Sequence, residues 1–98
     1  MTMNTYQETM RKLYDPENHE VLIASHRGKF SSSVMENTSL AFLTAIGEGA
    51  DMVEMDLEET KDGRIVGHHD DHMKRLFHND GRISDYTLEE LKAMPVYN

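Results

Sequence analysis

The sequence has no cysteine among its 98 residues. This absence excludes disulfides, thiolate nucleophiles and cysteine-type zinc sites, so histidine and carboxylates are the only strong metal ligands available. No stretch approaches the ~18 consecutive apolar residues of a transmembrane helix, and the start Met-Thr-Met-Asn-Thr lacks the basic and apolar parts of a signal peptide. We therefore expect a cytoplasmic protein without a membrane span.

Positive charge is also scarce. Ten Lys and Arg stand against 18 Asp and Glu, and the net charge is -8. A phosphate backbone would repel the chain as a whole, so nucleic acid is not an expected partner. The length fits one domain, and an apolar fraction of 38% allows a modest core.

The order of apolar patterns predicts an α/β fold. A strand, a helix and a second strand within so few residues make a βαβ unit with parallel strands. The predicted elements are a leading helix within residues 1–20, a strand at 21–25 buried on both faces, a helix from Asn37 or Thr38 to Ile46, and one strand at 51–59.

A hairpin is expected next, because residues 60–63 are too few for a parallel crossover. Asp-Gly is a preferred two-residue turn, and a turn centred on Asp62 and Gly63 would place Asp56 opposite His69. A loop at 74–84 and a last helix follow, and Thr87 and Glu90 form a capping box at the start of that helix.

Two carboxylates are the first candidate site. Strand alternation puts Glu54 and Asp56 on one face of the strand at 51–59. Two carboxylates in a covered position repel each other and need a cation to stay ionised. Oxygen ligands suit Ca²⁺ or Mg²⁺ better than zinc. The alternative, a solvated strand face, stays open at this point.

His26 and Arg27 directly follow the first predicted strand. Arginine can grip a phosphate with two N–H groups, and histidine can give or take a proton near neutral pH. The pair therefore suits phosphate-ester chemistry, although an ordinary surface loop would also explain it.

Three imidazoles and two carboxylates crowd residues 65–72. The predicted place of His69 opposite Asp56 singles it out for proton chemistry. His68 alternates to the other face and His72 lies beyond the strand, so we read both as structural neighbours. Asp70 is expected to support the loop or the adjacent histidine.

Five elements in order resemble the N-terminal part of the glycerophosphodiester phosphodiesterase family over about residues 21–94. They are His26-Arg27-Gly28, Glu36-Asn37-Thr38, Gly49-Ala50-Asp51 leading into Glu54-x-Asp56, Thr60-Lys61-Asp62-Gly63, and His69-Asp70 with Arg75. Any one of them alone would be a weak signal, but five at compatible spacing are specific.

This resemblance implies a TIM-type barrel that hydrolyses glycerophosphodiesters to glycerol 3-phosphate and an alcohol with Ca²⁺ or Mg²⁺. It further implies His26 and His69 as the acid and base pair, Glu54 and Asp56 as metal ligands, and Arg27 as a phosphate contact. Glu36 and Asp70 would be carboxylates that support these groups or line the substrate site.

The chain is short for that family, because a TIM barrel takes ~250 residues. The resemblance places a third metal carboxylate on a later strand, which this sequence lacks. We expect residues 1–98 to be a partial TIM-type (β/α) barrel: the N-terminal βαβ unit, a β-hairpin and flanking helices. Alone it should be inactive, and it should either be weakly stable or assemble with itself or with a complementing C-terminal fragment.

Two alternatives remain. The first is a non-catalytic fragment or metal-binding module of the same fold. The second is a helical phosphohydrolase in which His69 and Asp70 bind a metal together with His26 or His72. The strand-like residues 65–67 before the His-Asp pair argue against the second alternative.

Overall fold

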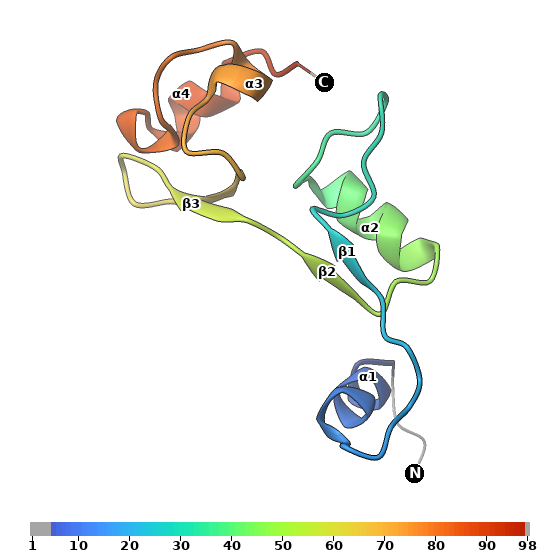
Figure 1. Ribbon diagram of the computed structural model, residues 1–98. Coiled ribbons are helices and arrows are strands. Elements are labelled where there is room, and N and C mark those ends of the chain that lie inside the picture. Colours follow the sequence, from blue (N-terminus) through green and yellow to red (C-terminus); the bar gives the residue numbers. More distant parts are fainter. Residues whose placement is uncertain (1–4, 98) are drawn as a thin grey trace.

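The computed structural model describes residues 5–97, and Figure 1 shows their path. Residues 1–4 of the expected leading segment and Asn98 lie outside the described residues. The elements are α1 (Thr5–Tyr14), β1 (Ala24–His26), α2 (Ser39–Gly47), β2 (Met52–Glu54), β3 (Leu57–Glu59), β4 (Ile65–Gly67), α3 (Lys74–Phe77), the 3₁₀ turn η1 (Ile83–Asp85) and α4 (Leu88–Lys92).

The predicted βαβ unit is confirmed. Strands β1 and β2 pair in parallel, and α2 connects them. The hydroxyl of Thr38 caps α2 by accepting from the backbone N–H of Ala41, which satisfies one of the free donors at the helix start. The pairing sets His26 beside Glu54 at the ends of the two strands.

The hairpin forms, but its predicted register is wrong by one residue. Strands β3 and β4 are antiparallel with Leu57 opposite Gly67, and the backbone N–H of Thr60 donates to the carbonyl of Arg64 at 2.7 Å. The loop therefore has three residues, 61–63, and Gly63 takes the left-handed conformation (φ +78°) that such a loop needs at its last position.

The register change moves His68, not His69, next to Asp56. The backbone N–H of His68 donates to the carbonyl of Asp56 at 2.9 Å. The single strand predicted at 51–59 is also wrong, because Met55 and Asp56 separate β2 from β3. At this break the Asp56 N–H donates to the side chain of Asn37 instead of a strand partner.

The strand at 21–25, expected to be buried on both faces, is largely open. Val21 is 84% exposed and Ile23 56%. The side chain of Leu43 in α2 is also exposed, at 71%. The described residues have a radius of gyration of 16.6 Å, against about 13 Å for a compact chain of this length. The βαβ unit therefore leaves apolar side chains of both its first strand segment and its helix uncovered.

The core lies in the C-terminal part of the chain. Met73, Ile83 and Leu91 are buried together, with Val66 and Phe77 packed against them. The loop predicted at 74–84 is corrected, because it contains α3 and η1. The capping box of Thr87 and Glu90 at the start of α4 is confirmed. Within residues 5–97, no helix is both long and apolar enough to cross a membrane.

Candidate active site

The end of β1 presents the first histidine. His26 is the last residue of β1, and its Nε2 lies 3.4 Å from Oε2 of Glu54. The chain then turns sharply through Arg27 (φ +59°) and Gly28 (φ +78°). A Cβ on Gly28 would lie 2.7 Å from the backbone of Ala41, so only glycine lets this turn pack against α2.

The second histidine arrives from the other half of the chain. His69 lies in the loop after β4, and its ring centroid is 6.4 Å from that of His26 with the rings at 76°. The two histidines that the sequence singled out thus lie close together, although the predicted register that placed His69 opposite Asp56 is wrong. Strand alternation does not apply to His69, because β4 already ends at Gly67.

The contact with Asp70 favours one tautomer of His69. The Nδ1 atom of His69 lies 2.9 Å from Oδ1 of Asp70. An ionised carboxylate only accepts hydrogen bonds, so Nδ1 carries the proton and Nε2 of the neutral ring has a free lone pair. The expectation that Asp70 supports the neighbouring histidine agrees with this contact.

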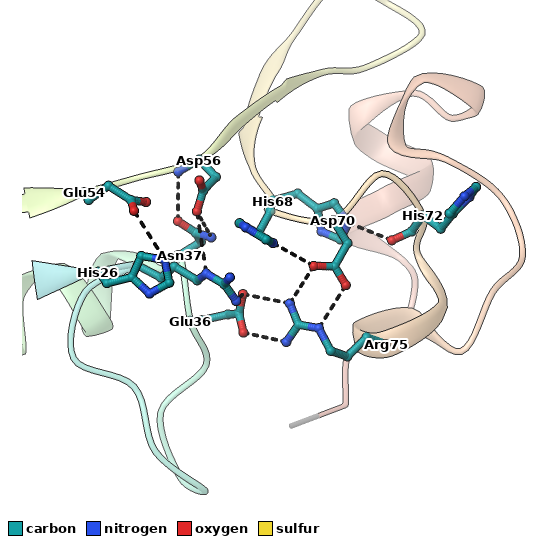
Figure 2. A network of polar contacts seen from close by, with 11 residues as sticks. His26, Glu36, Asn37, Glu54, Asp56, His68, Asp70, His72 and Arg75 are labelled. Carbon is teal, nitrogen blue, oxygen red and sulfur yellow. Dashed lines mark hydrogen bonds and ion pairs between the residues drawn. The ribbon is translucent and has the colours of Figure 1, made fainter.

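Glu36 lies at the centre of a network of ion pairs, which Figure 2 shows in part. It is 6% exposed and accepts from Nη1 of Arg27 at 3.1 Å. It also accepts from Nη1 and Nη2 of Arg75 at 2.6 and 3.0 Å. Arg75 in turn donates from Nε and Nη2 to Asp70 at 2.9 and 3.0 Å. Glu36 therefore connects the loop after β1 to α3.

These contacts keep the network ionised. Hydrogen bonds from Arg75 outweigh burial and hold the pKa of Glu36 below its usual value. Hydrogen bonds from Arg75 and then His69 push the pKa of Asp70 far below its usual range. The two carboxylates raise the pKa of Arg75 further, so the guanidinium stays charged.

Asn37 sets the position of Asp56. The Asn37 side chain accepts from the Asp56 backbone N–H at 3.1 Å and donates from Nδ2 to Oδ2 of Asp56 at 3.2 Å. Its own N–H donates to the carbonyl of Arg27 at 3.0 Å, and its backbone is left-handed (φ +55°). Asparagine tolerates that conformation better than most residues. Asn37 thus links the turn after His26 to the break between β2 and β3.

The carboxylates of Glu54 and Asp56 remain without a full set of partners. The Oε1 atom of Glu54 is buried and has no hydrogen-bond partner. Oxygen donors of this kind suit a hard divalent cation. Over residues 5–97, however, no group of three His, Asp or Glu side chains is arranged to hold a metal ion. The two side chains fit part of a cation site.

Of the other two imidazoles of the cluster, His68 is buried in a structural position, and the side chain of His72 is exposed. His68 is 3% exposed, its Nε2 lies 3.1 Å from the carbonyl of His72, and its ring packs on Phe77. The helical phosphohydrolase alternative is wrong, because His69 and Asp70 follow a strand and lie in a loop.

A family model for the glycerophosphoryl diester phosphodiesterase family matches residues 26–97. The chain belongs to this family. Glycerophosphodiester phosphodiesterase of Caldanaerobacter subterraneus subsp. tengcongensis, a curated family relative, is 43% identical over 75 residues, which are 76% of this chain and 30% of the relative. The protein of that name from Bacillus altitudinis is 46% identical over 70 residues, or 71% of this chain and 28% of the relative.

Solved structures of the family agree in fold. The Thermotoga maritima glycerophosphodiester phosphodiesterase is 47% identical with a TM-score of 0.66, over 76% of this chain and 33% of that one. The Parabacteroides distasonis protein is 28% identical with a TM-score of 0.73, over 100% of this chain and 37% of that one. The chain thus spans about a third of the length of the family members that it matches.

Sequence reasoning missed the structural roles of Asn37 and Arg75. The sequence indicates Asn37 only as a possible helix cap and as part of a motif, whereas the cap is Thr38. A cue existed, because asparagine between a turn and a helix is a candidate for left-handed backbone. Arg75 lies 39 positions from Glu36, and no local pattern predicts an ion pair over that distance.

Proposed function

We propose that this chain is part of a metal-dependent phosphodiesterase that cleaves glycerophosphodiesters to glycerol 3-phosphate and an alcohol. The observation that carries the proposal is the approach of His26 and His69, from two different halves of the chain, with ring centroids 6.4 Å apart. Membership of the family supports the same reaction. The fold we propose for residues 1–98 is the first part of a TIM-type barrel, with residues 21–94 as its family-like segment.

Proton transfer is assigned to the two histidines. The Nδ1–H bond of His69 to Asp70 leaves its Nε2 free to accept a proton from the attacking hydroxyl. His26, whose side chain is 62% exposed, would then protonate the leaving alkoxide. The attacking hydroxyl belongs either to water, which gives glycerol 3-phosphate directly, or to the glycerol 2-position, which gives a cyclic phosphate that water then opens.

Arg27 is assigned to the phosphate. Its guanidinium donates one N–H to Glu36, its buried Nε lies 3.9 Å from Oδ2 of Asp56, and its remaining N–H groups are left for a ligand. A charged donor with unused N–H groups beside two imidazoles can bind a phosphodiester oxygen.

Glu54 and Asp56 are assigned to a divalent cation, Ca²⁺ or Mg²⁺. The buried, unpartnered Oε1 of Glu54 supports this assignment. The bound cation would offset the negative charge of the phosphodiester. Glu54 and Asp56 would supply two of its ligands, and further ligands would be needed to complete the site.

We further propose that the chain needs a complement to act. Val21 and Leu43 expose apolar surface beside an open two-stranded sheet, and a complementing C-terminal segment or a second copy would cover it. The isolated chain is then inactive. Its cytoplasmic location stays a prediction.

The test places a segment of this chain in a relative that supplies the rest of the barrel. Residues 21–94 would replace the matching segment of the Thermotoga maritima enzyme, and hydrolysis of glycerophosphocholine would be measured with and without chelator. We expect turnover that chelator removes. His26→Ala and His69→Ala should each lower kcat by about 10²–10⁴-fold, the usual contribution of one proton transfer.

Near-normal rates in both variants would refute the catalytic assignment, and chelator-insensitive turnover would refute the metal role. Calcium binding by the joined protein without any turnover would instead favour the non-catalytic module. The unjoined 98-residue chain serves as the control for the need for a complement.

A further inference from the structure

We propose that Arg75 is a positioning residue that holds Asp70 so that His69 keeps its proton on Nδ1. The proposal rests on the function proposed above, because it concerns the histidine assigned there as the base. It adds a role to a residue that the proposed mechanism does not use.

The geometry of Arg75 is that of a bridge between two carboxylates. Its Nε and Nη2 bind the two oxygens of Asp70 at 2.9 and 3.0 Å, and its Nη1 and Nη2 bind the two oxygens of Glu36 at 2.6 and 3.0 Å. These four hydrogen bonds occupy four of the five N–H groups of a guanidinium. Figure 2 shows the two carboxylates on different edges of the planar group.

The bridge is anchored at its Glu36 end. The Glu36 side chain is only 5% exposed, and Arg27 also binds it. The Arg75 side chain itself is 44% exposed, so its own packing does not fix its direction. The buried carboxylate therefore determines where the guanidinium points, and the guanidinium determines where Asp70 points.

Asp70 depends on this anchor. Both of its oxygens accept from Arg75, and Oδ1 is shared with Nδ1 of His69. Its side-chain partners among residues 5–97 are Arg75 and His69. Without Arg75 the Asp70 side chain could rotate, and His69 would lose the acceptor that keeps its proton on Nδ1.

The same geometry separates Arg75 from Arg27. Arg27 uses one N–H for Glu36 and keeps others for a ligand, whereas Arg75 has almost none left. A change at Arg75 should therefore act on proton transfer and not on phosphate binding. In the joined enzyme we expect Arg75→Gln to lower kcat by about 10–100-fold, as loss of a histidine's hydrogen-bond partner does at metal sites. KM should stay unchanged.

The deciding experiment measures the tautomer of His69 in the 98-residue chain. Long-range proton–nitrogen NMR of histidine-labelled protein at pH 8 distinguishes a protonated from a bare ring nitrogen. We expect Nδ1 protonated and Nε2 bare in the original chain and in Lys74→Gln, a matched loss of an adjacent cation whose side chain is 82% exposed. In Arg75→Gln and Asp70→Ala the two nitrogen shifts should move towards each other.

An unchanged His69 tautomer in a folded Arg75→Gln would overturn the proposal. Should that variant lose its amide dispersion, Arg75→Lys, which keeps the charge but not the double fork, is measured in its place and should show a partial shift. An unchanged tautomer in Asp70→Ala would overturn the proposal in either case.

The two proposals fail in different ways. A shifted tautomer with normal turnover of the joined Arg75→Gln enzyme would reject His69 as the base and leave the positioning of its ring established. A fixed tautomer in an enzyme that His69→Ala inactivates would reject the positioning role and leave the function standing.

Discussion

The two halves of the molecule differ in how they are held together. The βαβ unit (β1, α2 and β2) buries Ala41 and Ala45 and little else, while the part from β3 to α4 has a core of Met73, Ile83 and Leu91. Each half nevertheless carries one of the two histidines. In Figure 1 the chain passes from one half to the other where β2 continues into β3.

The site therefore depends on the junction of the halves more than on either half alone. Glu36 and Asn37 of the first half contact Arg75 and Asp56, and the backbone of Asn37 lies directly against Gly67. These contacts are polar or very close, so small changes there should separate His26 from His69. The following substitutions test this difference between the halves.

Removal of a core side chain should have the largest effect on stability. Ile83 is 4% exposed, and Ile83→Ala should lower the free energy of unfolding by about 2–5 kcal/mol through lost burial and the cavity left behind. Leu43, 71% exposed, is the control, and Leu43→Ala should stay within about 0.5 kcal/mol. Urea unfolding followed by near-ultraviolet circular dichroism measures both. Equal losses would mean that the βαβ unit is as well packed as the C-terminal part.

Loss of the bridging carboxylate of Glu36 should have the second largest effect on stability. Glu36→Gln leaves Arg27 and Arg75 without their shared partner, and breaking a buried pair in this way costs about 3 kcal/mol, at the lower end of the range since Arg75 is 44% exposed. Glu89→Gln, at a side chain 85% exposed, is the control. Urea midpoints measure the change, and a Glu36→Gln chain as stable as the Glu89→Gln chain would show that the bridge does not hold the halves together.

A methyl group at the junction should have a smaller effect. A Cβ on Gly67 would lie 2.7 Å from the carbonyl oxygen of Asn37, so Gly67→Ala should cost about 1–3 kcal/mol and move the halves apart. Gly47 has open space around it, and Gly47→Ala in α2 should be neutral or stabilising by up to about 1 kcal/mol. Nuclear Overhauser contacts between the rings of His26 and His69 report the separation. Their survival in folded Gly67→Ala would contradict a tight junction.

Acid should produce the smallest and most gradual effect. The pKa of Glu36 is lowered by Arg75, so its contribution to stability is complete above the ordinary glutamate value of 4.5 and is lost as the pH falls below it towards the folded-state value. Asp70, whose pKa is lowered mainly by Arg75, acts in the same direction. Unfolding free energies from pH 6 to pH 2 should fall less steeply in Glu36→Gln. An identical slope in that variant would exclude Glu36 as the source.

Local rules predicted much of the fold. Thr87 and Glu90 cap α4 as expected, and the short connection between β3 and β4 forms a hairpin. The register failed because the left-handed Gly63 closes a three-residue loop, and the pattern Asp-Gly fits both loop lengths. The predicted burial of Val21 was wrong. A strand pattern predicts which side chains favour burial, but not whether other residues of the described chain pack against them.

The candidate site was predicted only in part. His26 and Glu54 come together because parallel strands end at the same edge, which is a local rule. The bridge from Glu36 to Arg75 joins residues 39 positions apart, and such pairs follow from the tertiary fold alone. The catalytic roles themselves stay predictions until the joined enzyme is assayed.

The side chain of Asn37 makes the site sensitive to chemical ageing. Its Nδ2 donates to the carboxylate of Asp56 at 3.2 Å, while its Oδ1 accepts from the Asp56 backbone. Deamidation would replace that donor with a second carboxylate oxygen and bring two negative charges face to face. Deamidation of Asn37 during storage would thus displace Asp56 although the gene sequence is unchanged.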